Sequence, residues 1–266
     1  MCYTTFHLEV INVTLTEFFN SKIDDIEQSD IENAYFMRSL IGDEDYAINK
    51  VEKVSVMESV VRSLSTFDIY KSIPLNKEIS VMKKKIAYMP YGDVSFCFGT
   101  QMLVGDDEEI IPTIIYPREL DKASYVFLGH EFHHALKDLN YSERKIRDRF
   151  AEVIPMFYEM ICANEETDEN VSKEIFKRRL ILLNGDKAEE TDDIIGQLQY
   201  FNSYYYALAL FNRYEEDKLL ILRLISRVLV GEISTLDLLN MLGIYEKDLD
   251  YTVSKELYNI KEYIHK

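Results

Sequence analysis

Residues 123–139 read ASYVFLGHEFHHALKDL and contain three of the five histidines of the chain. The stretch predicts a helix that begins after Asp121, a good N-cap residue. His130 and His134 stand four residues apart, so one face of this helix presents both imidazoles. Apolar neighbours predict that the two histidines are buried: Phe127, Leu128, Ala135 and Leu136.

The spacing of these two histidines is typical of a metal-binding helix. At positions i and i+4 the imidazoles converge on a point where a zinc ion can sit at about 2.0–2.1 Å from each nitrogen. Glu131 lies beside them, where it can reach a zinc-bound water, and completes the pattern His-Glu-x-x-His. With this composition the pattern arises by chance in about one chain in a hundred, so three chance histidines on a surface helix are the weaker interpretation. His133 leaves the shared face, and we expect it to be solvated or to support the ligands without binding metal.

A catalytic zinc site needs a third protein ligand, and Glu152 is the best candidate. The following segment predicts a helix over 142–163. A helical hairpin turning at 140–141 would bring a residue about three turns into that helix level with the histidines. Apolar neighbours predict that Glu152 is buried, where a carboxylate needs a cation. The alternative is an ordinary ion pair with Arg149 or Lys145 on the helix surface.

Glu159 stands two turns after Glu152 on the same predicted helix face. From there it could orient a histidine ligand by accepting a hydrogen bond from the ring nitrogen that does not bind metal. An ordinary surface ion pair is the alternative for this residue.

The two segments together resemble a known zinc site. HEFHH at 130–134 and FAEVIPMFYE at 150–159 resemble the zinc site of the oligoendopeptidase F and thimet oligopeptidase family, part of the gluzincin group. In that family the third ligand lies on the next helix, with a proline shortly after it and a further glutamate seven residues on. The resemblance implies a mononuclear zinc metallopeptidase with a largely helical, zincin-like core. The chain departs from the family at His133, where glycine is usual, at Pro155, which stands one place later, and in length, since family members are more than twice as long.

A tyrosine-rich segment lies further along the chain. Residues 199–210 read QYFNSYYYALAL, and Tyr200 and Tyr204 share a helix face. A phenol directed at the metal could donate a hydrogen bond to the oxyanion of a tetrahedral intermediate. The oligoendopeptidase family has a similar tyrosine cluster at this place in the chain order, which implies a role in substrate binding and oxyanion stabilisation, although Ala207 stands where that family has a tyrosine. The alternative is that these are core tyrosines in a chain that has 19 of them.

Hydrophobic periodicity predicts one mainly helical domain over 1–266. The part from 1 to 78 has apolar residues at helical spacing, as in Val51, Val54, Met57, Val61 and Leu64. After 117 helices are expected at 121–139, 142–163, 170–183, 191–213, 215–230, 234–242 and 246–264. Breaks are expected at three places: Asn184-Gly185, Gly231 and Gly243.

The part from 79 to 116 predicts a small antiparallel sheet or hairpin next to the histidine helix. Here Val94, Phe96 and Phe98 alternate with polar or small residues, and 105–107 reads as a turn. The second arm, 110–115, contains a proline, which donates no hydrogen bond to a neighbouring strand. We therefore expect an edge strand, to which the backbone of a substrate could add.

Composition favours a globular protein and excludes several partners. The chain has 266 residues, 47% of them hydrophobic, which supply a core. Its net charge of -17 would repel nucleic acid and an anionic membrane surface. The sequence shows neither a leader pattern nor an apolar run long enough to span a bilayer, so we expect a cytoplasmic protein. The three cysteines are widely separated, which argues against thiolate metal sites and disulfides.

The sequence therefore predicts one zinc ion per chain, held by His130, His134 and Glu152, with Glu131 as general base in the hydrolysis of peptides or proteins. A non-catalytic zinc-binding regulatory or sensor protein is an alternative, but a structural zinc needs four protein ligands and gains nothing from an adjacent base. A zinc hydrolase acting on a non-peptide amide is equally compatible with the pattern.

Overall fold

The described part of the chain is mainly helical, as its periodicity predicts. A computed structural model describes residues 27–42, 44, 46–48, 51–70, 87–90, 99–104, 110–140, 149–184, 191–245 and 247–266. Its helices are α2 (Gln28–Ile41), α3 (Val56–Thr66), α5 (Ser124–Asn140), α6 (Val153–Glu165), α7 (Glu169–Asn184), α8 (Thr191–Glu216), α9 (Lys218–Leu229), α10 (Thr235–Met241) and α11 (Asp250–His265), with a 3₁₀ turn η1 (Phe67–Tyr70) after α3. Its strands are β1 (Lys53–Val54), β2 (Ala87–Pro90), β3 (Gly99–Val104), β4 (Ile110–Tyr116) and β5 (Leu120–Asp121).

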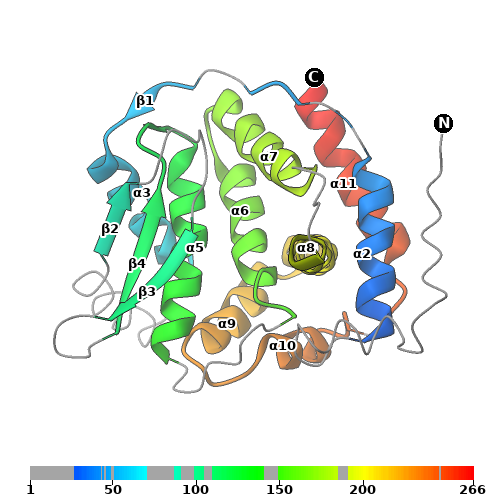
Figure 1. Ribbon diagram of the computed structural model, residues 1–266. Helices are drawn as coiled ribbons and strands as arrows, with labels where there is room; N and C mark the ends of the chain where they lie inside the picture. Colours follow the sequence, from blue (N-terminus) through cyan, green and yellow to red (C-terminus); the bar gives the residue numbers. More distant parts are fainter. Residues whose placement is uncertain are drawn as a thin grey trace.

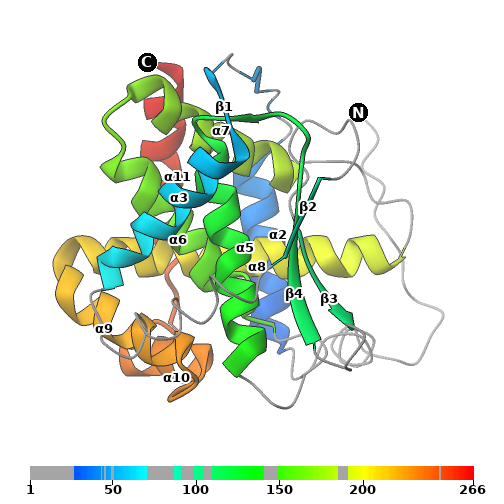
Figure 2. The same ribbon diagram turned by 90° about the vertical axis from the view of Figure 1, so that its left-hand side faces the viewer.

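The helices pack in a layered arrangement around α6. α5 packs on one side of α6 and α7 on the other, and α8 packs on the side that faces α2 (Figure 1). In the view turned by 90°, α8 runs crosswise to α6, and the small sheet lies beyond α5 (Figure 2). Among the described residues, no helix has both the length and the apolar character needed to cross a bilayer.

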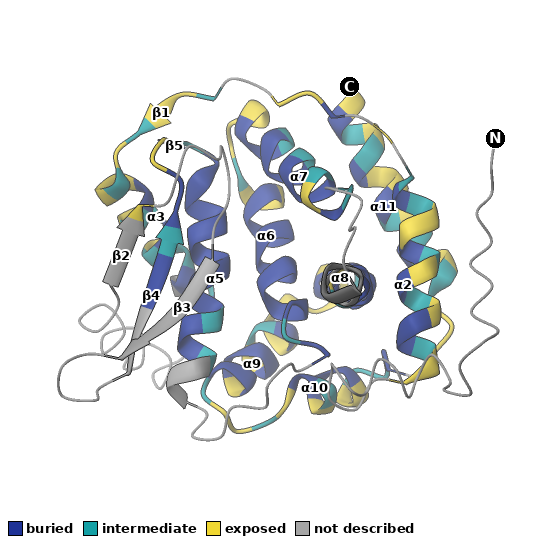
Figure 3. Ribbon diagram, in the orientation of Figure 1, coloured by how far each residue is buried: buried dark blue, intermediate teal, exposed yellow. Residues whose placement is uncertain are grey.

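α6 is the most enclosed of these helices. All its residues from Val153 to Ala163 are buried, Cys162 among them, and Figure 3 shows dark blue around most of its length, in contrast to the banded α2 and α11. A helix that is apolar on every side belongs in the middle of a core. Its glutamate, Glu159, must therefore find its partners inside the protein.

The sheet beside α5 has three strands in the order β2-β4-β3. β3 and β4 form the predicted antiparallel pair, but β2 pairs parallel to β4 on its other side. The prediction that 110–115 is an edge strand is therefore wrong, because β4 is the central strand. Pro112 is tolerated there because β2 pairs only from Thr113 onward, so Pro112 has a described neighbour, Met102, on one side only. The predicted alternation at 94–98 and the turn at 105–107 lie outside the described residues.

Several predicted boundaries agree with the structure and others are wrong. α7 to α10 begin and end within three residues of the predictions, and Gly231 and Gly243 have positive φ angles of 77° and 60° just after α9 and α10. The helix predicted at 246–264 begins at Asp250 instead. The expected N-cap Asp121 lies in β5, and α5 begins at Ser124. Asp121 still supports this helix start, because its Oδ1 accepts hydrogen bonds from the Ala123 amide at 3.1 Å and from the Ser124 hydroxyl at 3.0 Å.

The helical face predicted around Val54 is only partly present. Val54 belongs to β1, which pairs with β5, and α3 begins two residues later. Met57 and Val61, expected on the buried face, are 71% and 59% exposed. The apolar spacing there crosses a strand and a helix, so a single helical period does not describe it.

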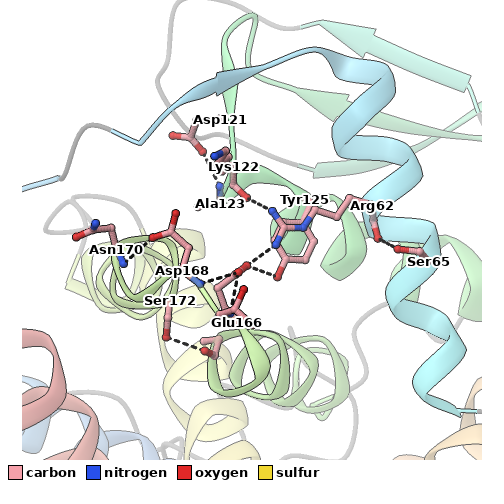
Figure 4. Close-up of polar contacts among 12 residues, drawn as sticks. Arg62, Ser65, Asp121, Lys122, Ala123, Tyr125, Glu166, Asp168, Asn170 and Ser172 are labelled. Atoms are coloured by element: carbon pink, nitrogen blue, oxygen red, sulfur yellow. Dashed lines mark hydrogen bonds and ion pairs between the residues drawn. The ribbon is translucent and has the colours of Figure 1, made fainter.

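Glu166 joins three elements at one end of the helical layer (Figure 4). Its Oε2 accepts from Arg62 of α3 and, at 3.1 Å, from the Tyr125 hydroxyl of α5. Its Oε1 accepts from the amides of Thr167 and Asp168, just before α7, at 3.0 and 3.2 Å. These contacts tie α3, the start of α5 and the junction of α6 with α7 together.

Candidate metal centre

His130, His134 and Glu152 lie together, as the sequence predicts. The Nε2 atoms of the two histidines are 3.1 Å apart. Glu152 Oε2 lies 3.0 Å from His130 Nε2, and Glu152 Oε1 lies 3.3 Å from His134 Nε2. Among the described residues, this is the group of three whose ligand atoms could hold a metal ion.

Glu152 reaches the histidines by a different route from the predicted one. The helix expected from residue 142 begins at Val153, and Glu152 is its N-cap, with φ −90° and ψ −9°. Residues 149–152 form a turn, and residues 141–148 lie outside the described part of the chain. The third candidate ligand is therefore presented at a helix N-terminus rather than from about three turns inside a helix. The alternative pairing with Arg149 is wrong, because that guanidinium binds Asp30 and Glu27.

Gly129 sets how closely α5 and α6 approach beside the site. A Cβ built at this position would overlap the hydroxyl and ring carbons of Tyr158 in α6, a side chain with no exposed surface. The next residue is His130, so this contact places that histidine against α6. The role of Gly129 was not predicted from the sequence, where the available signal was a glycine inside an otherwise good helix.

Glu159 contacts His130, as expected for a residue that orients a ligand. Its Oε1 lies 2.7 Å from His130 Nδ1. A carboxylate only accepts, so Nδ1 keeps its proton when Nε2 loses one, and the lone pair of Nε2 then faces His134 and Glu152. This is the tautomer that a metal ligand needs.

Arg179 fixes Glu159 from the other side and was not foreseen from the sequence. Arg179 Nε donates to Glu159 Oε2 at 2.7 Å, and Nη2 donates to Glu159 Oε1. Arg179 is 7% exposed and Glu159 2% exposed. Two parallel bonds between a guanidinium and a carboxylate fix orientation as well as charge. His130 is thus held by a buried carboxylate that has its own fixed partner.

The electrostatics of the site favour a positive charge at its centre. Burial lowers the pKa of His130, but Glu159 and Glu152 outweigh burial and raise this pKa to about 10. Burial raises the pKa of Glu152, and the two histidines more than reverse it, so this pKa lies well below its usual value. Burial likewise raises the pKa of Glu159, but the positive charges of Arg179 and His130 outweigh burial, so this pKa lies below its usual value.

The spacing of the three ligand atoms fits a single ion. Two ligands at about 2.0–2.1 Å from a tetrahedral ion lie roughly 3.3 Å apart. The nearest separations between the three side chains run from 3.0 to 3.3 Å, with Glu152 Oε2 nearest His130 and Glu152 Oε1 nearest His134. Glu152 Oε2 is buried and has no hydrogen-bond partner among the described residues, because its 3.0 Å contact with His130 lacks hydrogen-bond geometry. A cation could sit among these three side chains, and a donor set of two imidazoles and a carboxylate suits zinc.

His133 does not belong to this group. Its Nδ1 donates to the Gly129 carbonyl at 2.7 Å, so its Nε2 accepts from the Tyr70 hydroxyl at 2.7 Å. It is 2% exposed and packs between the rings of Phe67 and Tyr158, with centroids 4.7 Å away in each case. Burial lowers its pKa to about 3. The expectation of a solvated residue is wrong, since His133 is a neutral core residue that joins α5 to η1.

The tyrosines of α8 divide by burial. Tyr204 is 1% exposed, and its hydroxyl has no hydrogen-bond partner among the described residues. Burial raises its pKa, and its charged neighbours are Arg179 and Glu159. Tyr200, one turn earlier, is 42% exposed and is among the groups that raise the pKa of Arg179. Both tyrosines therefore lie on the Arg179 side of the site, while Tyr205 and Tyr206 are core residues with 1% and 2% exposure.

A hollow opens beside His134. It has room for about one water molecule and is lined by His133, His134, Lys137, Ala151, Ile154, Pro155, Val228, Leu229 and Thr235. The side chain of His134 is 20% exposed, whereas that of His130 is 6% exposed. The candidate metal centre is thus more accessible at His134 than at His130. Glu131, next to His130 in α5, is 7% exposed.

Comparison of the chain with protein families, with curated proteins and with solved structures gives no match.

Proposed function

We propose that this chain is a zinc-dependent peptidase in which His130, His134 and Glu152 hold one zinc ion. The observation that carries the proposal is the close approach of three buried or half-buried side chains, whose nearest donor atoms are separated by about the distance between two ligands of one tetrahedral ion. The cluster has three members among the described residues. Three protein ligands leave a fourth position for water or substrate, which is the arrangement of catalytic zinc sites.

The protein groups around the centre have distinct tasks in this proposal. Bound zinc supplies a Lewis acid that polarises the scissile carbonyl and makes water a better nucleophile. Glu131, next to a ligand on the same helix, accepts the proton of the attacking water and then donates it to the leaving amine. Glu159 and Arg179 keep His130 in the tautomer whose Nε2 faces the centre.

The exposed tyrosine is the better candidate for contact with substrate. Tyr200 has 42% of its surface exposed, so its hydroxyl can meet a bound peptide, whereas Tyr204 is enclosed. We propose Tyr200 as the donor to the oxyanion or to the peptide backbone. Tyr204 then supports the site from within through its place beside Arg179 and Glu159.

Chemistry argues against a purely regulatory zinc protein. A structural or sensing site gains nothing from a carboxylate beside one ligand, while hydrolysis requires a base at that place. The alternative of a non-peptide amide as substrate shares every group named above.

Removal and return of zinc test the proposal directly. Chelated protein is expected to leave a mixed peptide library uncut, and addition of zinc is expected to restore cleavage at a stoichiometry of one ion per chain. Cleaved products are identified by mass spectrometry, with wild-type protein in the presence of chelator as control. Stoichiometric zinc with an uncut library would favour the sensor protein, and a chain that binds no zinc would refute both.

Replacement of Glu159 tests the support of His130. Glu159→Gln removes the charge that holds the Nδ1 proton, and zinc affinity is expected to fall by about 10- to 100-fold, the usual cost of losing a group hydrogen-bonded to a ligand. The matched control is Glu174→Gln, because Glu174 is also fully buried and pairs with an arginine, Arg178, at 2.8 Å. Zinc dissociation constants measured by competition with a chelating dye should change for the first variant alone. Equal values for both variants would show that Glu159 does not act on the centre.

A further inference from the structure

The turn at residues 149–152 presents Glu152, and a buried arginine stands at its start. Arg149 is 5% exposed, and its guanidinium reaches away from the histidines into the core. Nη1 donates to Asp30 Oδ2 at 2.7 Å, and Nη2 donates to Glu27 Oε1 at 3.2 Å and to the Tyr245 hydroxyl at 3.1 Å. Arg149 therefore joins this turn to α2 and to the segment after α10.

The partner of Arg149 is itself held on several sides. Asp30 is 1% exposed and belongs to the capping box of α2, where its Oδ2 accepts from the Glu27 amide at 2.9 Å. Its Oδ1 accepts from Asn202 of α8 at 3.1 Å. A carboxylate that two other donors already fix cannot follow a moving arginine, so the ion pair fixes the position of Arg149.

The packing around the guanidinium also limits the turn. Its central carbon lies 4.7 Å from the ring centre of Phe150 and 5.4 Å from that of Tyr245. The Phe150 ring in turn packs edge-on against Tyr206 of α8. Arg149 and Phe150 are thus anchored in the core, three and two positions before Glu152.

We propose that Arg149 is a positioning residue for the metal centre. Through Arg149, the N-terminus of α2 holds Glu152 within reach of the two histidines. Glu152 is the N-cap of α6, so its place depends on the turn that precedes it as well as on α6. The inference rests on the proposed zinc site and adds a contribution from the N-terminal part of the chain, which contains none of the ligands.

Arg149→Met removes the anchor. Zinc is expected to bind about tenfold more weakly or worse, within the range known for residues that support a ligand. Hydrogen exchange is expected to accelerate at the amides of Val153 and Met156, which donate to the Phe150 and Glu152 carbonyls at 3.2 and 3.0 Å. Arg149→Lys keeps the charge and is expected to recover part of both properties.

A second variant separates anchoring from stability. Arg149→Met alone leaves the Asp30 carboxylate buried without its partner, which destabilises a fold. Arg149→Met combined with Asp30→Asn removes both charges, so stability should return in large part while the anchor stays absent. In this double variant zinc is still expected to bind more weakly, and hydrogen exchange at residues 150–156 is still expected to be faster than in the wild type.

Lys261→Met is the matched control at the other end of α2. Lys261 Nζ donates to the carbonyls of Leu40 and Ile41 at 3.1 and 2.9 Å, so its loss loosens α2 without touching the turn. This variant is expected to bind zinc as the wild type does.

The outcomes separate the two proposals. Wild-type zinc affinity and exchange in Arg149→Met, or recovery of both in the double variant, would overturn the anchor and leave the zinc site standing. A wild-type chain that binds no zinc would overturn the proposed function. In that case the exchange data alone decide whether Arg149 fixes the turn.

Discussion

Glu131→Gln is expected to lower the rate of peptide cleavage by about 100- to 10,000-fold, the usual contribution of a general base, while the chain still binds one zinc ion. Glutamine has the size of glutamate but cannot accept the proton of the attacking water. The three atoms whose spacing defines the centre belong to His130, His134 and Glu152, so zinc binding does not depend on residue 131. Turnover is measured on the peptides that the wild type cleaves, and zinc content by elemental analysis.

Glu131→Asp serves as the companion variant. It keeps a carboxylate but draws it back by one methylene, so part of the activity should remain. A Glu131→Gln protein that cleaves at the wild-type rate would exclude Glu131 as the base. A Glu131→Gln protein that loses its zinc would instead give this residue a structural role at the centre.

Gly129→Ala is expected to destabilise the metal-free fold by about 3 kcal/mol, the upper part of the usual range for overpacking a core. The new methyl group would overlap the Tyr158 side chain, which is fully buried and has little room to move. Intrinsic helix propensity predicts the opposite sign, since alanine is better than glycine by about 1 kcal/mol inside a helix. Because α5 must shift relative to α6, zinc affinity should fall as well. Denaturation by urea in the presence of chelator measures the first effect.

A double-mutant cycle provides the control for this prediction. Tyr158→Leu shortens the obstructing side chain and removes the hydroxyl that is hydrogen-bonded to Thr66. If the clash is the cause, the combined variant should lose less stability than the sum of the two single losses. Strict additivity, or a Gly129→Ala protein more stable than the wild type, would contradict the close approach of the two helices.

The part of the site that lies within one helix was predictable. His130, Glu131 and His134 are related by helical spacing alone. The apolar residues around them indicated burial correctly for His130 and Glu131, whereas the side chain of His134 is 20% exposed. Glu152 was found because a glutamate among apolar neighbours needs a partner, an argument that holds whatever the path of the chain. The predicted path itself was wrong, since Glu152 stands at the start of α6.

The supporting residues could not be predicted in the same way. Arg179 follows another arginine, and nothing local distinguishes the one that binds Glu159 from the one that binds Asp121 and Glu174. The place of β4 in the middle of its sheet depends on β2, and a strand's own residues do not reveal which neighbour it acquires.

By itself, the sequence determined a helix with two histidines on one face, a neighbouring glutamate and a further glutamate among apolar residues, because these properties follow from local periodicity and composition. Only the tertiary structure decided that the carboxylate meets the histidines. That outcome depends on contacts such as the one between Arg149 and Asp30, which lie 119 positions apart, and on the crossing of α5 and α6 at Gly129. Contacts of this kind arise when a whole core is packed at once, and no window of sequence contains both partners.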